Sequence, residues 1–371
     1  MKIVVVEPFY TESHKKWLDE LIKHSSHTII PLTLTGLFWK WRMHGGAVTL
    51  ARTFKQLDLR PDLIVCTDML DVNVFCGLLR KELEGIPIAL YFHENQISYP
   101  WSPADQDVQL GRDRHYGFIN YTSALAVDRV YFNSHYHSET FVNGLGQFLN
   151  GFPDHLNLET MDEIAGKSEV LSLGMDLNSL DSVVPPVKTK SAIPIILWNH
   201  RWEYDKNPEQ FFKALFRLKD EGHVFKLVVL GREYPNKPSI FDRARRKLKD
   251  HILHWGYVES SDEYADWLYK ADILPVTSIQ DFFGISVVEA IYCGCIPLLP
   301  NRLAYPEHIS ESEMFYDTEV EFYEKLKGLV NRHPSHPNLD LEKIKSYDWT
   351  HQILLYDAAF SRLSANFSDK E

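Results

Sequence analysis

Short apolar runs alternate with amphipathic segments along the first half of the chain. The runs have the length and composition of buried strands, and they cover residues 3–6, 28–32, 63–66, 88–92 and 130–132. Apolar residues at helical spacing occupy stretches between them, such as 14–23 and 136–148. Because strands that alternate with helices build parallel sheets with right-handed crossovers, the pattern predicts an α/β fold. The pattern blurs between residues 151 and 174.

The same alternation restarts after a segment that contains the adjacent prolines Pro185 and Pro186. New apolar runs cover residues 195–198, 227–230, 273–276 and 296–299, and helices are expected from Val320 onward. The proline segment therefore reads as a linker between two domains. We expect an N-terminal domain over 1–184, a linker over 185–194, a second domain over 195–346, and a separate C-terminal helical segment over 347–371.

Two acids lie on either side of a glycine where a helix is expected to begin. Asp281 precedes Gly284, and Glu289 falls within the segment whose apolar residues recur at helical spacing. The free amides of a helix N-terminus attract phosphate and hydroxyl oxygens, and a glycine lets a ligand approach the backbone closely. This arrangement favours a sugar-nucleotide site. The alternative is an acidic helix cap with a solvated glutamate.

Two cations follow the first strand of the second domain. Arg201 and Lys206 lie in a polar turn that ends at Pro208, a suitable first residue of a helix. Guanidinium and ammonium groups at the end of a strand suit a diphosphate leaving group, whose negative charge develops during the reaction. The alternative is a surface ion pair with Glu203 or Asp205.

Composition adds limits on these interpretations. The chain has 371 residues, of which 44% are hydrophobic and 24% charged, enough for two domain cores. No apolar run is long enough to cross a membrane and residues 1–6 lack the regions of a signal peptide, so we expect a cytoplasmic protein without membrane contact. The four cysteines, Cys66, Cys76, Cys293 and Cys295, lie in apolar surroundings without zinc-ligand spacing, which favours buried thiols.

The net charge of −12 argues against nonspecific binding of nucleic acid. One local segment nevertheless interleaves aromatic and cationic residues: Phe38-Trp-Lys-Trp-Arg-Met-His44. Such a segment suits unstacked RNA bases and nearby phosphates. The alternative is a loop whose tryptophans pack on the first domain while its cations stay in water.

Further segments share a pattern with one known family over most of the chain. They are Pro8-Phe-Tyr with Ser13-His-Lys15, Phe92-His-Glu-Asn-Gln-Ile-Ser-Tyr-Pro100, Arg114-His-Tyr-Gly117, Phe132-Asn-Ser134, His200-Arg-Trp-Glu with Asp205-Lys-Asn-Pro208, and Glu289-Ala-Ile-Tyr-Cys-Gly-Cys295 with Tyr305-Pro-Glu307. With Asp281 and Glu289 as an acid-x7-acid signature, the chain resembles the tRNA-queuosine α-mannosyltransferases, which belong to the retaining glycosyltransferases of family 4. Asp281 stands where that pattern usually has glutamate, and Thr11-Glu12 stands where a glycine pair is expected.

The resemblance implies the GT-B architecture, in which two Rossmann-like domains have facing parallel sheets with a cleft between them and the last helix packs back on the first domain. It implies a transfer of mannose from GDP-mannose to queuosine in a tRNA anticodon loop, with no cofactor and no metal. The implied catalytic residues are His93, Arg201, Lys206 and Asp281. The implied donor site consists of Arg201, Lys206, Gly231, Asp281, Phe282, Phe283, Gly284 and Glu289.

The acceptor, tRNA containing queuosine, is expected on the first domain. Its expected contacts are His14, Trp39, Lys40, Trp41, Arg42, Glu94, Asn95, Gln96, Tyr99 and Arg114. Two alternatives stay open: a family 4-like enzyme with another sugar nucleotide and a small or lipid acceptor, and a catalytically silent nucleotide-binding module. An NAD-dependent oxidoreductase is disfavoured because no Gly-x-Gly-x-x-Gly follows Val6 or Leu230.

Overall fold

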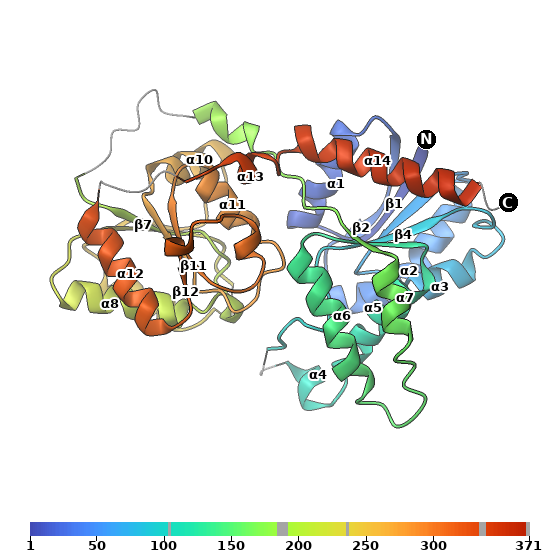
Figure 1. Cartoon of the computed structure of the whole chain (residues 1–371), viewed down its shortest axis with the longest axis horizontal. Coiled ribbons are helices and arrows are strands. Elements are labelled where there is room, and N and C mark those ends of the chain that lie inside the picture. The colour runs from blue at the N-terminus through green and yellow to red at the C-terminus, as the bar shows by residue number, and fades with distance from the viewer. Residues whose placement is uncertain (103–104, 184–191, 235–236, 334–338, 369–371) are drawn as a thin grey trace. The chain divides into compact units, whose positions relative to one another are not determined.

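The chain folds into two compact units, as seen in a computed structural model that describes residues 1–102, 105–183, 192–234, 237–333 and 339–368. The first unit contains residues 1–175 and the C-terminal segment from Trp349 onward, and the second contains Asp176–Asp348 (Figure 1). Among the described residues no helix combines the length and the apolar character needed to cross a membrane.

The first unit is built on a six-stranded sheet whose neighbouring strands all pair in parallel. Its strands, in the spatial order β2-β1-β3-β4-β5-β6, are β1 (Lys2–Tyr10), β2 (Thr28–Thr35), β3 (Leu63–Thr67), β4 (Ile88–Phe92), β5 (Arg129–Phe132) and β6 (Ser168–Val170). Its helices are α1 (Glu12–His24), α2 (Trp39–Gln56), α3 (Val72–Leu78), α4 (Gln106–Gln109), α5 (Arg114–Ala126), α6 (His135–Leu149), α7 (Thr160–Gly166) and α14 (Trp349–Ser368). The parallel sheet predicted from the alternating pattern is confirmed, and β6 and α7 fall in the stretch where that pattern blurred.

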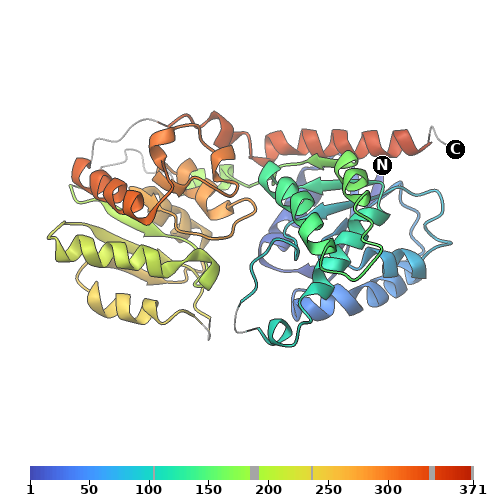
Figure 2. The same ribbon diagram turned by 60° about the horizontal axis from the view of Figure 1, so that its bottom comes forward.

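Helices cover both faces of this sheet, which explains why its strands are apolar at consecutive positions. Val4 and Val6 point into a core shared with α2, α3, α5 and α6. On the other face, Tyr91 of β4 stacks on Trp17 of α1 at 4.8 Å and contacts Tyr356 of α14. Trp17 and Tyr91 both hydrogen-bond the Tyr356 hydroxyl. The C-terminal helix therefore packs on the first unit, as Figure 2 shows from a second direction.

The second unit repeats the design with a second six-stranded parallel sheet. Its strands, in the order β12-β11-β10-β7-β8-β9, are β7 (Ile195–Trp198), β8 (Lys226–Leu230), β9 (Ile252–Gly256), β10 (Ile273–Pro275), β11 (Ile296–Pro300) and β12 (Phe315–Tyr316). Its helices are α8 (Pro208–Asp220), α9 (Ile240–Lys247), α10 (Ser261–Lys270), α11 (Ile285–Tyr292), α12 (Glu319–Arg332) and α13 (Glu342–Lys345), with 3₁₀ turns η1 (Asn178–Val183), η2 (Tyr204–Lys206), η3 (Tyr305–Glu307) and η4 (Ser312–Met314). Pro208 is the first residue of α8, as its position after the polar turn predicted.

The chain passes between the units earlier than the apolar pattern indicated. We expected the first domain to end at residue 184, whereas the second unit begins at Asp176. Asp348 ties the start of the second unit to its end, since its carboxylate accepts hydrogen bonds from the backbone of Leu177 and Asn178 at 3.0 and 3.2 Å. These contacts join segments far apart in the sequence, so a local pattern cannot reveal them. Most of the expected linker over 185–194, namely residues 185–191, lies outside the described residues.

Gly174 should tolerate no side chain, because a Cβ atom there would lie 2.5 Å from the ring of the buried Trp349. We predict that Gly174→Ala lowers the free energy of unfolding by about 1–3 kcal/mol through overpacking. Gly77→Ala is the matched control: nothing lies within 4 Å of its added methyl group, and alanine favours the helix by about 0.5–1 kcal/mol. Urea unfolding followed by circular dichroism should shift the two midpoints in opposite directions. Equal midpoints would contradict this packing.

Candidate active site

Lys206 is the centre of the polar cluster in the second unit. Its ammonium group donates to the carbonyl oxygen of Gln280 at 2.8 Å and pairs with Asp205 at 3.1 Å and Asp281 at 3.3 Å. The Lys206 side chain is 9% exposed and that of Asp205 is 1% exposed. These three contacts match the three hydrogens of the ammonium group. The sequence placed Lys206 and Asp281 in one site, and the structure brings them into direct contact.

The opposite charges in this cluster keep Lys206 and the neighbouring acids ionised despite the cost of removing them from water. Burial alone would lower the pKa of Lys206, but Asp281 and Asp205 outweigh it and raise that pKa above its usual value. Burial would raise the pKa of Asp281, but the charge of Lys206 and the hydrogen bond from Tyr305 outweigh it and lower that pKa. The Asp281 carboxylate also accepts a hydrogen bond from the Tyr305 hydroxyl at 2.8 Å. Asp281 is therefore an ionised and oriented acceptor, as a sugar-hydroxyl ligand would need to be.

The segment after β7 and the start of α11 are held together by hydrogen bonds. The side chain of Asn199 donates to the carbonyl oxygen of Ser286 at 2.7 Å, and His200 Nδ1 lies 3.0 Å from the Ser286 hydroxyl. Burial lowers the pKa of His200 to about 4, so this imidazole is neutral at physiological pH. Glu289 lies in α11 as predicted, is 7% exposed, and accepts a hydrogen bond from the Tyr264 hydroxyl at 2.8 Å. It is therefore a buried, oriented carboxylate and not the solvated glutamate of the alternative.

Two glycines of the predicted donor site fill positions that demand glycine. Gly231 has φ +114°, and a Cβ atom there would lie 2.3 Å from the carbonyl oxygen of His200. Gly284 has φ +89° and directly precedes α11, where a Cβ atom would press on Tyr305 at 3.0 Å. Phe282 and Phe283 beside it are buried. The N–H groups of Val287 and Val288 donate to the carbonyl oxygen of Gly284 at 2.9 and 3.1 Å. The amides of the first helical residues before them point along the helix axis, so this end of α11 suits oxygen ligands.

Arg201 differs from Lys206 in its surroundings. Its side chain is 46% exposed, and its guanidinium lies 3.4 Å from the carboxylate of Glu203. This is the surface ion pair that the sequence left open as an alternative. An exposed pair of this kind contributes at most about 1 kcal/mol, so a phosphate can displace Glu203 at little cost. Arg201 is therefore the more accessible of the two cations.

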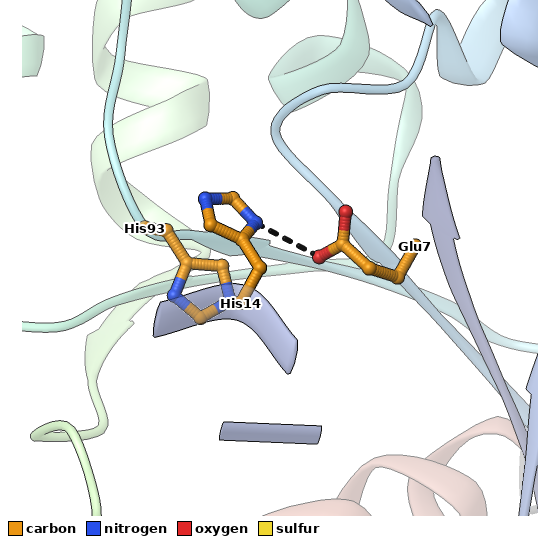
Figure 3. A group of neighbouring side chains, drawn as sticks. All are labelled: Glu7, His14 and His93. Atoms are coloured by element: carbon orange, nitrogen blue, oxygen red, sulfur yellow. Dashed lines mark hydrogen bonds and ion pairs between the residues drawn. The ribbon is translucent and has the colours of Figure 1, made fainter. Parts of the chain in front are cut away.

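A second polar cluster lies at the carboxyl ends of three neighbouring strands of the first unit. Glu7 belongs to β1, while Asp68 and His93 directly follow β3 and β4. His14 Nδ1 lies 3.0 Å from the Glu7 carboxylate, and the rings of His14 and His93 have centroids 4.2 Å apart with their planes tilted by 42° (Figure 3). The His93 backbone N–H donates to Asp68 at 2.8 Å. Ligands of open α/β sheets bind at this edge, and both predicted histidines lie at it.

Burial and charge separate the protonation states of these groups. Burial would lower the pKa of His14, but the charge of Glu7 outweighs it and raises that pKa to about 9. Burial and the neighbouring His14 charge lower the pKa of His93 well below its usual value. Burial raises the pKa of Asp68 to about 8. At neutral pH the pair therefore consists of a cationic His14 and a neutral His93.

Glu7, His14 and His93 also have donor atoms within 4.8 Å of one another, a spacing that a metal site would need. The two oxygens of Glu7 are already engaged, one by the backbone N–H of Phe9 at 2.7 Å and the other by His14. A metal would have to displace the proton that His14 shares with Glu7. We therefore interpret the cluster as a hydrogen-bonded ion pair.

The loop after His93 carries one buried side chain that shapes the loop and several partly exposed ones. Asn95 is fully buried and accepts hydrogen bonds from the backbone N–H groups of Ile97 and Ser98, so it shapes the loop. This use of its side chain differs from the expected contact with the acceptor, and short-range sequence could not distinguish the two. Gln96 donates to Glu94 at 2.9 Å, and both are partly exposed, as is Tyr99.

The aromatic and basic segment begins at Phe38, directly before α2, and continues through the first six residues of that helix, so it is not the loop considered as an alternative. Trp39 packs against Trp101 and Tyr116. Lys40 lies within 5.3–5.9 Å of these three ring centres and bonds Asp105 and Asp107 at 2.6 and 2.5 Å. These two acids neutralise Lys40, so its expected phosphate contact is already occupied. The acids lie far along the chain, and the local pattern did not reveal them.

Two other aromatic residues of that segment reach the surface, whereas Met43 is buried. Trp41 is 63% exposed and Phe38 is 76% exposed. Arg42 donates to the carbonyl oxygen of Thr35 at 3.0 Å. Arg114, on α5, donates to the carbonyl oxygen of Gly151 at 2.8 Å and so anchors a loop of its own unit.

Sequence reasoning did not single out Glu7, Asp68 or Tyr264. Glu7 and Asp68 are acids at the carboxyl ends of adjacent parallel strands, and that placement is a signal that could have identified them. Tyr264 lies on α10 and meets Glu289 only in the folded unit, so no local pattern marks it.

Comparison with known proteins links both units to glycosyltransferases. Residues 2–175 match the family described as tRNA-queuosine alpha-mannosyltransferase N-terminal, and residues 186–332 match glycosyl transferases group 1. Over 331 residues the chain is 32% identical to the tRNA-queuosine alpha-mannosyltransferase of Drosophila melanogaster, covering 87% of this chain and 85% of that protein. Over 171 residues it is 23% identical to the GDP-mannose:cellobiosyl-diphosphopolyprenol alpha-mannosyltransferase of Xanthomonas oryzae, covering 43% and 45% of the two chains.

Solved structures of low identity share the fold. Sucrose-phosphate synthase from Thermosynechococcus elongatus matches with a TM-score of 0.69 at 13% identity, covering 99% of this chain and 100% of that one. An E. coli structure described as trehalose-6-phosphate bound with UDP-2-fluoro glucose matches with a TM-score of 0.67 at 12% identity, covering 98% and 99%. The expected GT-B fold of two Rossmann-like domains is thus confirmed.

Removing the Lys206 charge should leave Asp205 and Asp281 buried without compensation. We predict that Lys206→Met lowers the free energy of unfolding by about 3–5 kcal/mol, since a broken buried pair costs that much. Arg201→Met is the matched control, because its exposed pair should change stability by less than about 1 kcal/mol. Urea unfolding of the purified variants measures both values. A Lys206→Met protein as stable as the wild type would contradict the proposed charge balance.

Proposed function

The chain belongs to the tRNA-queuosine alpha-mannosyltransferase family of glycosyltransferases, and we propose that it transfers mannose from GDP-mannose to queuosine in a tRNA anticodon loop. The observation that carries this proposal is the 32% identity to the Drosophila enzyme over 87% of the chain. The match to that family's N-terminal part over residues 2–175 supports the same acceptor. Such an enzyme would meet its tRNA in the cytoplasm.

In the proposed reaction the diphosphate of the donor lies at the start of α11. Arg201 exchanges its exposed partner Glu203 for the diphosphate, and the helix amides bind further oxygens. Lys206 stays between its carboxylates and acts through its charge and through the orientation of Asp281. These fixed cations take up the charge of the leaving group, so the proposed mechanism needs no divalent cation.

The remaining donor contacts follow from the oriented acids. Asp281, held by Tyr305, accepts hydrogen bonds from mannose hydroxyls, and Glu289, held by Tyr264, accepts from the ribose. His93, whose imidazole is neutral, hydrogen-bonds substrate at the edge of the first sheet. Breaking of the glycosidic bond gives the sugar oxocarbenium character, and the acceptor hydroxyl attacks on the face that the diphosphate leaves. The departing phosphate takes the hydroxyl proton.

The exposed aromatic residues at the start of α2 suit unstacked bases of the anticodon loop. A Cβ atom at Gly45 would lie 2.5 Å from the Trp41 ring, so this glycine lets the indole lie flat on the helix. Phe38 has φ +54°, a strained conformation for a bulky residue, and it still exposes its ring. Because Lys40 is neutralised, we expect stacking to contribute more than phosphate contacts.

A second candidate is transfer of mannose to a lipid-linked sugar. The partial match to the Xanthomonas enzyme, whose name describes a diphosphopolyprenol acceptor, favours it. That match covers 43% of this chain, whereas the match to the tRNA-queuosine enzyme covers 87%. The tRNA acceptor is therefore the better-supported proposal.

Arg201→Ala should lower turnover without unfolding the protein. We predict a loss of about 3 kcal/mol of transition-state stabilisation, or about 100-fold in kcat, as for removal of one oxyanion donor. Arg217→Ala is the control: Arg217 lies on α8, is exposed and is also paired with a glutamate, and its removal should leave turnover at the wild-type level. Mass spectrometry of nucleosides from tRNA incubated with GDP-mannose measures the product. Equal turnover in the two variants would refute the diphosphate contact.

Phe38→Gly should separate stability from RNA binding. Glycine relieves the positive φ, so we predict an increase of about 1 kcal/mol in the free energy of unfolding. Loss of the ring should weaken tRNA binding by about 1–3 kcal/mol, and Trp41→Ala should weaken it similarly. Fluorescence anisotropy with queuosine-containing tRNA measures binding. Asp58→Gly is the control, because Asp58 has φ +44° and follows the other end of α2. This variant should be more stable than the wild type and should bind tRNA with unchanged affinity. Weaker tRNA binding by Asp58→Gly, or unchanged binding by Phe38→Gly, would count against the stacking surface.

A further inference from the structure

Glu7 is held rigidly beside His14 in the interior of the first unit. The side chain of Glu7 is fully buried, and His14 is 6% exposed. One Glu7 oxygen accepts the backbone N–H of Phe9 at 2.7 Å, and the other lies 3.0 Å from His14 Nδ1. Both oxygens are thus engaged, and the carboxylate cannot turn away without losing a hydrogen bond in a buried place. Figure 3 shows the His14 ring directed toward Glu7, with the His93 ring beside it at a tilt of 42°.

His93 is fixed by aromatic rings while one of its ring nitrogens stays unpaired. Trp17 and Tyr91 meet its ring edge-on at 4.8 and 4.9 Å. Its Nε2 atom is buried and has no hydrogen-bond partner among the described residues. A buried nitrogen without a partner is costly unless a ligand completes its hydrogen bonding.

The charged groups around this pair come from several elements. Glu7 on β1, Asp68 after β3 and Glu94 after β4 act on His14. His14 and, from α6, His137 act on His93. Of the three acids, Glu7 alone makes a direct hydrogen bond to the His14 ring in the part of the chain that the structure describes.

We propose that Glu7 is a positioning residue that holds His14 as an imidazolium at the carboxyl end of the first sheet, and that this cation keeps the neighbouring His93 uncharged for its contact with substrate. The contact of His93 with substrate rests on the proposed function, whereas the charge states do not. His14 directs its second N–H away from Glu7 and can offer it to an oxyanion or a hydroxyl oxygen. Neutral His93 can accept a hydrogen bond from a substrate hydroxyl, which a protonated ring could not do.

The raised pKa of His14 sets the pH range in which its ion pair with Glu7 stabilises the fold. The pKa of His14 is raised to about 9 in the folded protein from an ordinary value of about 6.5. Its contribution to stability is therefore fully present below about pH 6.5 and is lost as the pH rises through about 9. Removal of the Glu7 charge leaves burial as the main influence, which lowers the His14 pKa.

The test is an NMR titration of the full chain labelled with ¹³C at the histidine Cε1 position. The signals of His14 and His93 are assigned by their loss in His14→Gln and His93→Gln. In the wild type we expect His14 to stay protonated through pH 8 and His93 to stay neutral down to below about pH 6.5. A wild-type His14 that titrates at or below 6.5 overturns the proposal, even if every Glu7 variant fails to fold.

Glu7→Gln and Glu7→Asp extend the test to activity. In Glu7→Gln the His14 midpoint should fall by at least two pH units and the His93 midpoint should rise. Mannosyl transfer at pH 7.5 should drop at least tenfold and recover as the pH is lowered, which loss of packing alone would not produce. Glu7→Asp should restore part of the wild-type pH profile. Unchanged titration and an unchanged pH profile in Glu7→Gln would overturn the proposal.

Glu20→Gln is the matched control, because Glu20 also bonds a histidine of α1, His24, at 3.1 Å but on the more exposed side of the helix. It should leave the His14 signal and the pH profile unchanged; if it shifts both as Glu7→Gln does, the effect is one of overall charge and the proposal fails. If the wild type forms no mannosyl-queuosine, the proposed function fails, while the two titrations still decide whether Glu7 sets the charge of His14.

Discussion

The buried ammonium of Lys206 is the interaction on which the candidate donor site depends. Asp205, Asp281 and the carbonyl oxygen of Gln280 converge on it, and each of these acids would be costly to bury alone. Through Asp281 the charge reaches Tyr305, which in turn lies against Gly284 at the start of α11. One buried cation thus fixes both the acid expected to bind sugar and the helix end expected to bind phosphate. The ion pairs are compatible with a ligand because Asp281 keeps part of its surface in contact with solvent.

The first unit also contains a buried charge with a partner, but there the acid Glu7 holds the cationic His14 in place. Glu7, Asp68 and His93 come from the ends of three adjacent strands, where the parallel sheet gathers side chains that are distant in sequence. Glu7 raises the pKa of His14 despite burial, while burial and the charge of His14 lower the pKa of His93, so one ring is charged and the other is not. Groups with opposed protonation states at a sheet edge are typical of sites that bind and move protons.

Patterns that repeat within a few residues were predictable from sequence, and contacts between distant segments were not. Helical spacing located α11 between Gly284 and Tyr292, and Pro208 marked the first residue of α8. Lys40 was assigned to phosphate because Asp105 and Asp107, which neutralise it, lie in another segment. In the same way, the hydrogen bond from Leu177 to Asp348 joins segments far apart in the chain, so the local pattern did not reveal that residue 177 belongs with the second unit. Positive φ at Glu12 explains why the related pattern has glycine there, but the backbone conformation is visible only in the fold.

Mannosylation of queuosine in tRNA is the activity that we propose for this chain. It is tested by incubating the wild-type protein with matched tRNAs that contain or lack queuosine and with GDP-mannose, GDP-glucose or UDP-glucose, followed by nucleoside mass spectrometry. We expect a queuosine nucleoside heavier by one hexose, formed from GDP-mannose and from queuosine-containing tRNA alone. Equal modification of queuosine-free tRNA, or no modified nucleoside while a polyprenol-linked acceptor is glycosylated, would contradict it.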